Sequence, residues 1–359
     1  MNIGIPRERR PDENRVGLTP WRVEALAAAG HRCYVEQGAG VGAGFSDESY
    51  TRAGGQIVYS GEEVYGRADL VVKVGRPTNE EMNWLRTGQA VMAFWHLAAA
   101  HPAKLDLLLR RHITSIAYEM IQNDDGSLPV LRSMSQIAGR MSAHIAAGLL
   151  QNDRGGKGVL LGGLPGVAPA EVVVLGAGVV GTNAARAFAG LGATVYVLDR
   201  DVNRLERLTE QGNRFITLFS HPHNIEKVVH FADVVIGAVL VPGSRAPVLV
   251  TRDMVRKMRR RSVIVDIAID QGGCIETSRP TTHQSPTFLV DDVIHYCVPN
   301  MAGVLGRTAT HALTNATARY ISYMVEHGIE AAIDGTALGR GVVTHNGQIT
   351  ATALSRGEL

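Results

Sequence analysis

The sequence of 359 residues has few cysteines, no long apolar run and almost no excess of one charge. Its three cysteines, Cys33, Cys274 and Cys297, are too few and too scattered for a disulfide framework or a C-x-x-C metal site, which favours a reducing compartment. No uninterrupted apolar stretch reaches the roughly 18 residues that a membrane-spanning helix needs. The first ten residues, MNIGIPRERR, lack the apolar core of a signal peptide. We therefore expect a cytoplasmic protein with no metal site and no membrane partner.

The sequence also has almost no excess of positive over negative charge, because 36 basic and 34 acidic side chains leave a net charge of +2. The basic residues concentrate in one place, RKMRRR at 256–261, which we interpret as the solvated end of a helix. A nucleic-acid-binding domain normally carries a basic face or stripe. This composition therefore predicts no nucleic-acid partner.

The most informative stretch is AEVVVLGAGVVGTNAARAFAG at 170–190. A valine-rich segment at 171–175 has the character of a buried parallel strand, and an alanine-rich helical pattern follows it. Gly176, Gly178 and Gly181 lie between them as G-x-G-x-x-G. This arrangement brings a pyrophosphate close to the N–H groups at a helix N-terminus. It predicts a dinucleotide-binding site.

A second predicted strand, 194–198, ends at Asp199. An acidic residue about 20 positions beyond the glycines is the group that accepts hydrogen bonds from the ribose 2′-hydroxyl of NAD. The next residue, Arg200, is able to meet a 2′-phosphate, but the carboxylate before it would repel one. We therefore predict NAD rather than NADP as the cofactor.

The fold class that we predict is α/β, with two Rossmann-like domains, each a mostly parallel sheet with flanking helices, joined by long crossing helices. A chain of this length exceeds the usual size of one hydrophobic core. We assign 1–132 and 306–359 to a substrate-binding, catalytic domain and 133–305 to the NAD-binding domain. The predicted crossing helices lie at 136–150 and 308–328.

Four polar residues follow predicted strands, where ligands of α/β sheets bind: Arg15, His96, Asp270 and Asn300. Each also has an ordinary interpretation, as a surface arginine, a strand-end histidine, a capping carboxylate or a turn residue. Together they match what a nicotinamide enzyme needs. Histidine exchanges protons near neutral pH, and arginine binds carboxylates through two parallel hydrogen bonds.

Several long strings are spread over nearly the whole chain, among them ENRVGLTP at 13–20, FWHLAA at 94–99, MSQIAGR at 134–140 and GAGVVGTNAA at 176–185. Through these strings the sequence resembles the alanine dehydrogenase family. The resemblance implies reversible, NAD-linked oxidative deamination of L-alanine to pyruvate and ammonia, by a homo-oligomer that is commonly a hexamer. The α subunit of nicotinamide nucleotide transhydrogenase is a more distant relative and lacks the histidine motif.

Transferred to this sequence, the resemblance makes Arg15 the group that binds the substrate carboxylate and His96 the proton-transferring residue. Asp270 becomes the second catalytic polar group, and Asn300 belongs to the substrate-binding loop. Besides the glycine loop, the resemblance assigns these residues to cofactor binding: Ser135, Val179, Val180, Asp199, Arg204, Ser220, Val239, Leu240, Ile267, Asp270, Arg279, Val298 and Met301.

The sequence departs from the family pattern at Gly75, where KVKEP of the family has a substrate-contacting lysine. Lys73 cannot replace it, because the two positions lie roughly 6–7 Å apart along one strand face. Arg76 starts on the opposite face, but we include it among the substrate-binding residues because its long side chain can turn into the site. Ala302 and Gly306 also stand where the family has prolines.

Three hypotheses therefore remain open. In the first, Arg76 or a neighbour replaces the lysine, and the protein is an alanine dehydrogenase acting on an amino-acid or keto-acid substrate. In the second, it is an NAD(P)H-dependent dehydrogenase or imine reductase for a different amino acid, keto acid or cyclic imine. In the third, it is a catalytically weak, NAD(H)-binding oligomeric protein.

Overall fold

The chain divides into two compact units, Met1–Met134 with Ala302–Leu359, and Ser135–Met301. The computed structural model describes residues 1–97, 101–210, 212, 215–240, 245–333 and 336–350. The sequence-based boundaries were 132/133 and 305/306. The assignment of one unit to substrate and the other to NAD stays a prediction.

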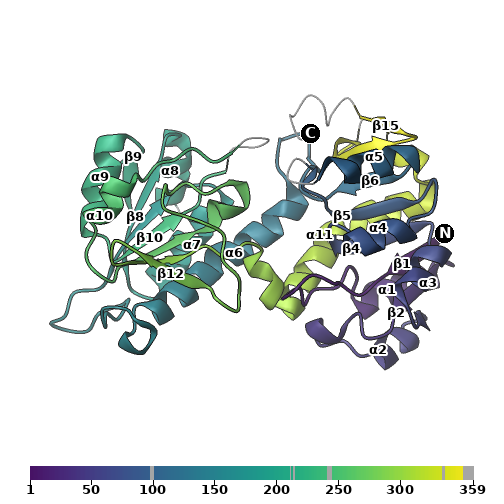
Figure 1. The fold of residues 1–359 in the computed structure, drawn as a ribbon, viewed down its shortest axis with the longest axis horizontal. Coiled ribbons are helices and arrows are strands. Elements are labelled where there is room, and N and C mark those ends of the chain that lie inside the picture. The colour runs from purple at the N-terminus through teal and green to yellow at the C-terminus, as the bar shows by residue number, and fades with distance from the viewer. Residues whose placement is uncertain (98–100, 211, 213–214, 241–244, 334–335, 351–359) are drawn as a thin grey trace. The chain divides into compact units, whose positions relative to one another are not determined.

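The first unit contains an eight-stranded sheet in the order β15-β14-β6-β5-β4-β1-β2-β3 (Figure 1). Its strands are β1 (Asn2–Ile5), β2 (Arg32–Glu36), β3 (Gln56–Val58), β4 (Leu70–Gly75), β5 (Ala90–Phe94), β6 (Thr114–Ala117), β14 (Val342–His345) and β15 (Gln348–Ile349). Strands β1 to β6 pair in parallel, whereas β14 pairs antiparallel with β6 and β15. The carboxyl ends of β1, β4 and β5 therefore meet at one edge.

The helices of this unit are α1 (Pro20–Ala28), α2 (Asp47–Arg52), α3 (Gly61–Arg67), α4 (Asn79–Trp84), α5 (Pro102–Arg110) and α11 (Gly306–His327). Several begin at the side-chain caps that their sequences predict. In α4, the Thr78 hydroxyl accepts from the Glu81 N–H while the Glu81 carboxylate accepts from the Thr78 N–H. This capping box fixes the start of α4 directly after the loop at Gly75.

The second unit contains a seven-stranded sheet in the order β12-β13-β11-β10-β7-β8-β9. Its strands are β7 (Glu171–Leu175), β8 (Thr194–Asp199), β9 (Ile216–Phe219), β10 (Val234–Gly237), β11 (Val263–Asp266), β12 (Thr287–Val290) and β13 (Val293–Tyr296). Only the β12–β13 pairing is antiparallel among the described strands of this sheet. The helices are α7 (Val179–Gly190), α8 (Val202–Thr209), α9 (Pro222–Phe231) and α10 (Arg252–Arg256). The predicted fold class is confirmed.

The two long helices differ from their predicted bounds. Helix α6 (Pro129–Leu149) begins seven residues before position 136 and continues from the first unit into the second. Pro129 explains the early start, because proline fits the first turn of a helix, where its missing N–H costs nothing. Helix α11 lies wholly in the first unit, since the boundary falls at Met301. Of the two, α6 is therefore the helix that crosses.

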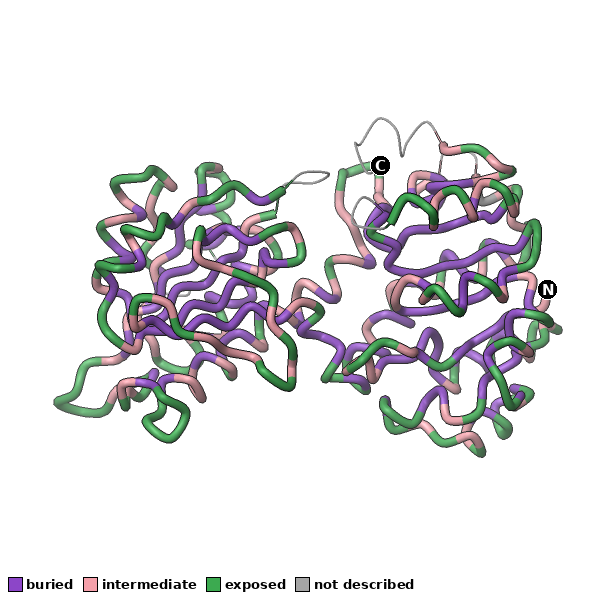
Figure 2. The backbone as a smooth tube through the Cα atoms, viewed as in Figure 1, coloured by how far each residue is buried: buried purple, intermediate pink, exposed green. Residues whose placement is uncertain are grey.

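The central strands of both sheets are buried, whereas exposed residues concentrate on helices, loops and edge strands such as β9 and β12 (Figure 2). Strands β4, β5, β7, β10 and β11 are buried at nearly every position, as expected for parallel strands covered on both faces. One of these positions is charged, because the Lys73 side chain in β4 has no exposed surface.

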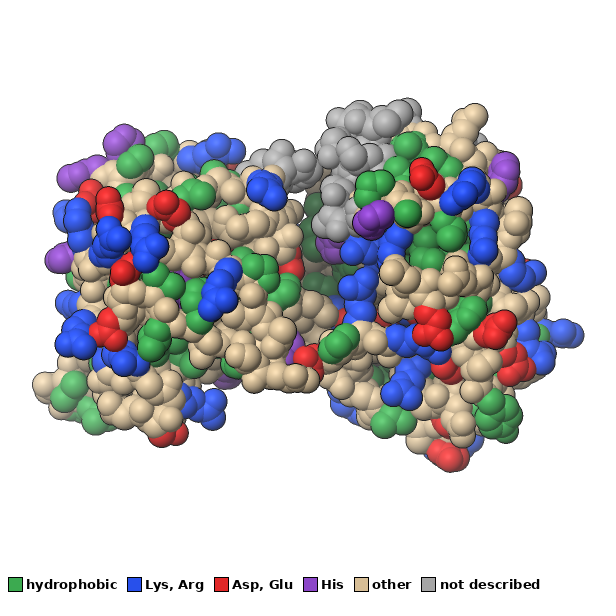
Figure 3. All heavy atoms as spheres, viewed as in Figure 1, with side chains coloured by type: hydrophobic (Ala, Val, Ile, Leu, Met, Phe, Trp, Pro, Cys, Tyr) green, Lys and Arg blue, Asp and Glu red, His purple; other side chains and the backbone are tan. Residues whose placement is uncertain are grey.

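Basic and acidic side chains are interspersed on the face shown in Figure 3. Oppositely charged side chains form ion pairs such as Lys257 with Glu226 and Arg256 with Asp253. Within the described residues, no helix is both long enough and apolar enough to cross a membrane.

Candidate functional site

The glycine loop of the second unit connects β7 to α7 and is built on very close backbone contacts. Gly176 has φ +103, a conformation that L side chains rarely adopt. A Cβ on Gly181 would lie 1.7 Å from the Gly176 carbonyl oxygen, so only glycine fits there. At Gly178, by contrast, a Cβ would meet no atom of the chain within 4 Å. The loop is tightly packed underneath and open at the N-terminus of α7, where unsatisfied N–H groups bind anions.

Asp199, the last residue of β8, supports this loop from the neighbouring strand. Its Oδ2 accepts a hydrogen bond from the Ala177 N–H at 2.7 Å, and its Oδ1 accepts one from the Asp201 N–H at 2.9 Å. The Arg204 guanidinium lies 3.8 Å from Oδ2. The carboxylate is therefore fixed beside the loop, where a ribose attached to a bound pyrophosphate would lie.

Most other predicted cofactor residues follow the carboxyl ends of adjacent strands in this sheet. Ser220 follows β9 and its N–H donates to the Asp199 carbonyl at 3.0 Å. Others are Val239 and Leu240 after β10, Ile267 and Asp270 in the 3-10 helix η4 (Ile267–Gln271) after β11, and Val298 and Met301 after β13. Val179 and Val180 begin α7, and Asn300, which was predicted to bind the substrate, also follows β13. The sheet thus collects these residues at one edge.

Two predicted contacts lie on other elements than these strand ends. Ser135 is on α6. The Arg279 guanidinium stacks on the Phe288 ring at 4.4 Å from its centre. Asn300 is exposed with φ +55, which agrees with a turn conformation that asparagine tolerates.

Asp266 was missed by the sequence reasoning. This buried carboxylate ends β11 and accepts hydrogen bonds from the N–H groups of Ala268, Cys274 and Ile275 at 3.1–3.3 Å. Burial raises the pKa of Asp266. Asp266 thereby shapes the η4 loop that presents Asp270. The signal was present in the sequence, because an aspartate that ends a strand is a common cap.

In the first unit, His96 follows β5 in a strained left-handed conformation, with φ +42 and an exposed side chain. Glu119 holds it in place. The Glu119 carboxylate accepts hydrogen bonds from the His96 N–H at 2.5 Å and the Trp95 N–H at 3.2 Å, and Oε1 lies 3.8 Å from His96 Nδ1. Strain of this kind concentrates at functional sites. Sequence reasoning did not find Glu119.

Arg15 is buried and paired with Glu13. Its Nε donates to Glu13 Oε1 at 2.6 Å, Nη2 donates to Oε2, and Nη1 lies 3.2 Å from the Met134 sulfur. The pair holds Arg15 in one orientation and offsets its charge. An anion at Arg15 therefore gains less net attraction than it would from an isolated arginine.

Arg76 is positioned by the backbone around His96. Its Nη1 donates to the carbonyls of Trp95 at 3.1 Å and His96 at 2.7 Å. Burial and the nearby Arg10 lower the pKa of Arg76. Arg76 thus links the end of β4 to the histidine loop, and its predicted contact with substrate stays a prediction.

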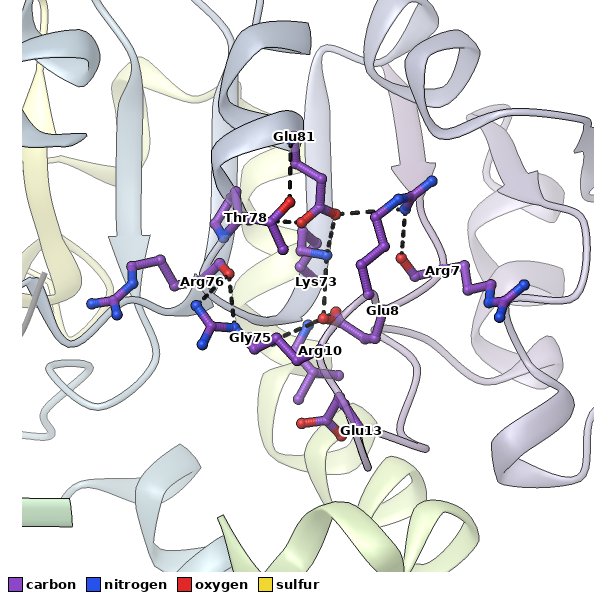
Figure 4. A network of polar contacts seen from close by, with 12 residues as sticks. Arg7, Glu8, Arg10, Glu13, Lys73, Gly75, Arg76, Thr78 and Glu81 are labelled. Carbon is purple, nitrogen blue, oxygen red and sulfur yellow. Dashed lines mark hydrogen bonds and ion pairs between the residues drawn. The ribbon is translucent and has the colours of Figure 1, made fainter. Parts of the chain in front are cut away.

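Lys73 lies between two buried glutamates beneath this edge (Figure 4). Its Nζ is 2.6 Å from Glu81 Oε1 and 3.2 Å from Glu8 Oε2. Burial disfavours the Lys73 cation, but Glu8 and Glu81 outweigh that effect and raise the pKa of Lys73. Glu8 in turn accepts hydrogen bonds from the N–H groups of Val74 and Gly75 at 2.7 and 3.4 Å. The network therefore fixes the backbone at the end of β4.

Each unit thus gathers its own predicted residues at the carboxyl edge of its sheet. Arg15, Arg76 and His96 belong to the first unit, whereas Asp270 and Asn300 belong to the second. No cluster of histidine, cysteine or carboxylate side chains suited to a metal ion occurs among the residues that the structure describes.

A Rossmann-type sheet with this glycine loop, in a chain that also carries a second parallel α/β unit, defines a two-unit dinucleotide-binding protein. The family model for the alanine dehydrogenase/PNT N-terminal domain matches residues 4–138, and that for the C-terminal domain matches residues 142–352. The chain belongs to the alanine dehydrogenase/PNT family, which confirms the resemblance.

Two curated relatives show how far the likeness extends. The chain is 48% identical to an alanine dehydrogenase of Mycolicibacterium smegmatis, over 99% of this chain and 96% of the relative. It is 47% identical to an alanine dehydrogenase of Methanococcus maripaludis, with the same coverage.

Solved structures agree. An L-alanine dehydrogenase superposes with a TM-score of 0.94 at 46% identity, covering 99% of this chain and 98% of that one. A transhydrogenase from Sinorhizobium meliloti superposes with a TM-score of 0.84 at 26% identity, covering 98% and 99%.

Gly181→Ala and Gly178→Ala form a matched pair that separates folding from ligand binding. Because its Cβ would overlap the Gly176 carbonyl, Gly181→Ala should lower the free energy of unfolding by about 2 kcal/mol or more. Gly178→Ala adds a methyl group in open space, so its stability should change by less than about 1 kcal/mol while its NADH affinity falls. Urea denaturation and NADH fluorescence titration measure the two effects. Equal NADH affinity in Gly178→Ala and wild type would contradict a phosphate site at the loop.

Lys73→Met should destabilise the protein by about 3–5 kcal/mol, because it leaves Glu8 and Glu81 buried without their cation. The matched control is Lys257→Met. Lys257 also pairs with a glutamate at 2.6 Å, but both side chains are about half exposed and screened by water, so its loss should change stability far less than the loss of Lys73. Chemical denaturation of both variants checks the difference. Similar losses in the two would show that the buried network does not fix the end of β4.

Proposed function

We propose that this protein is an NAD-dependent L-alanine dehydrogenase. It converts L-alanine, NAD and water reversibly into pyruvate, ammonia and NADH. The observation that carries the proposal is the likeness to proteins of that name at 46–48% identity, over nearly the full length of both chains.

NAD is assigned to the second unit. The open N-terminus of α7 suits the pyrophosphate, and the Asp199 carboxylate suits a ribose 2′-hydroxyl while repelling a 2′-phosphate. The chemistry that NAD supplies when bound is acceptance of a hydride from the α-carbon of the substrate.

Substrate binding and proton transfer are assigned to the first unit. Arg15 pairs with the substrate carboxylate, and Glu13 keeps its guanidinium oriented. Loss of hydride from L-alanine leaves an iminium carbon, to which water adds before ammonia leaves. His96 takes the proton from this water and returns it to the departing nitrogen. Glu119, bonded to the His96 N–H, keeps the imidazole at the strand end. Asp270 and Asn300, which belong to the second unit, keep their predicted catalytic and substrate-binding roles.

We further propose a cytoplasmic location and a homo-oligomer, with the hexamer as the expected state. The cytoplasmic location is supported by the cysteines, because Cys33, Cys274 and Cys297 are all buried free thiols. Burial raises the pKa of Cys33 to about 12 and that of Cys297 to about 11, so both resist oxidation.

A second candidate rests on Gly75, which has no side chain where the resemblance predicts a lysine. In that case the same groups act on a larger amino acid, keto acid or cyclic imine.

Oxidation of NADH with pyruvate and ammonia tests the proposal, run beside a panel of larger 2-keto acids and cyclic imines. We expect pyruvate to have the highest kcat/KM, because near-full-length relatives are alanine dehydrogenases. Omission of ammonia is the control for simple keto-acid reduction. If a larger substrate has a kcat/KM at least about tenfold above that of pyruvate, the second candidate function replaces the first.

His96→Asn should lower kcat by about 100-fold or more while NADH affinity stays within about twofold. Asparagine is chosen because it tolerates the left-handed backbone that position 96 requires, so the loop keeps its shape. Steady-state kinetics and fluorescence titration provide the two readouts. Turnover near the wild-type value would remove His96 from the proton-transfer role.

A further inference from the structure

Arg10 lies across the backbone of Gly75 (Figure 4). It is in the loop after β1, in a turn closed by the Glu13 N–H and the Arg10 carbonyl at 3.3 Å. A Cβ built on Gly75 would lie 3.4 Å from Arg10 Cδ and 3.5 Å from Arg10 Nε. The Arg10 side chain therefore lies in van der Waals contact with the position that a Cβ at residue 75 would take, and Glu8 Oε2 lies 3.6 Å from the same point.

The guanidinium of Arg10 is exposed, and its described contacts leave donors available. Nε and Nη2 donate to the Arg76 carbonyl at 3.3 and 3.2 Å. No described carboxylate forms an ion pair with Arg10, because the nearby acids have other partners. Glu8 contacts Lys73, and Glu13 contacts Arg15. An arginine carries five N–H donors, so three remain for a ligand.

Two further cations lie near Arg10 at this edge. Arg76 donates to backbone carbonyls, and Lys104 Nζ donates to the Pro77 carbonyl at 2.7 Å. Burial, Arg76 and Arg10 together lower the pKa of Lys104 to about 8. Among the described residues, none of these three cations forms an ion pair with a carboxylate. These three cations lie at the edge that carries His96 and Glu119, where they attract an anion.

Arg15 alone does not supply this attraction, because Glu13 offsets its charge at hydrogen-bond distance. A substrate carboxylate bound only at Arg15 would be repelled by the Glu13 carboxylate beside it. A second cation offsets this repulsion, and arginine is suited to that role because its planar donors match both carboxylate oxygens.

We propose that Arg10, held across Gly75, is a substrate-binding residue that pairs with the carboxylate of the 2-amino or 2-keto acid. The proposal rests on the function proposed above and gives a reason why the chain tolerates glycine at position 75. Arg76 then has a positioning role, since its carbonyl orients Arg10 and its guanidinium orients the His96 loop.

Steady-state kinetics of Arg10→Met with pyruvate, ammonia and NADH tests this. Methionine keeps the apolar length that covers Gly75 but removes the charge. We expect KM for pyruvate to rise about 10- to 100-fold, as for loss of a charged hydrogen bond, while kcat and the NADH affinity stay within about threefold. Arg10→Lys should recover part of the loss, because it restores the charge without the planar fork.

Arg7→Met is the matched control, because Arg7 is an exposed arginine of the same loop. Its KM for pyruvate should not change. The double variant Arg10→Met/Gly75→Lys should return KM to within about fivefold of wild type, because the lysine restores a cation at this edge and its Cβ meets the side chain at position 10 only at van der Waals distance.

An unchanged KM in Arg10→Met would overturn the proposal, as would equal losses in KM and NADH affinity. Failure of the proposed function looks different, because wild type would then prefer another acid of the panel. The Arg10→Met comparison is run on that acid, where the same rise in KM is expected. Absence of the rise there also overturns the role of Arg10.

Discussion

The ammonium group of Lys73 is the interaction on which the first unit's candidate site depends. It sits inside the sheet with no exposed surface and contacts both Glu8 and Glu81. Glu8 accepts hydrogen bonds from the N–H groups at the end of β4, and Glu81 takes part in the capping box of α4. One buried charge thus sets the geometry of the loop after β1 and the loop after β4 together. Arg10 and Gly75 are neighbours because these two loops are fixed.

In the second unit, carboxylates at strand ends also bind backbone N–H groups. Asp199 accepts from Ala177 in the loop after β7 and from Asp201 in the loop after β8, and Asp266 accepts from Cys274 in the loop after β11. Glu119 acts similarly on the loop of His96 in the first unit. In each case a carboxylate satisfies backbone donors that would otherwise be unpaired near a buried edge, which makes the loop rigid.

Sequence reasoning found the features that depend on residues close together in the chain. The glycine loop, the strands β7 and β8 and the placement of Asp199 follow from local pattern, and the structure has them as predicted. The start of α6 at Pro129 was missed because the hydrophobic pattern alone marks a helix interior better than its first turn. Glu119, Glu8 and Arg10 were missed for another reason. Glu119 contacts a residue 23 positions away and Glu8 one 66 positions away, and no pattern in one sequence reports such contacts.

The antiparallel strand β14 has a consequence for how the chain is made. Ser115 of β6 bonds to Thr344 of β14, its partner 229 positions later in the chain. During synthesis, β6 therefore remains an open sheet edge until the whole second unit has left the ribosome. The second unit is one continuous segment and needs no later residues for its sheet. The unit that begins the chain is thus the last to be completed, and the edge of β6 is open to mispairing until β14 has been made.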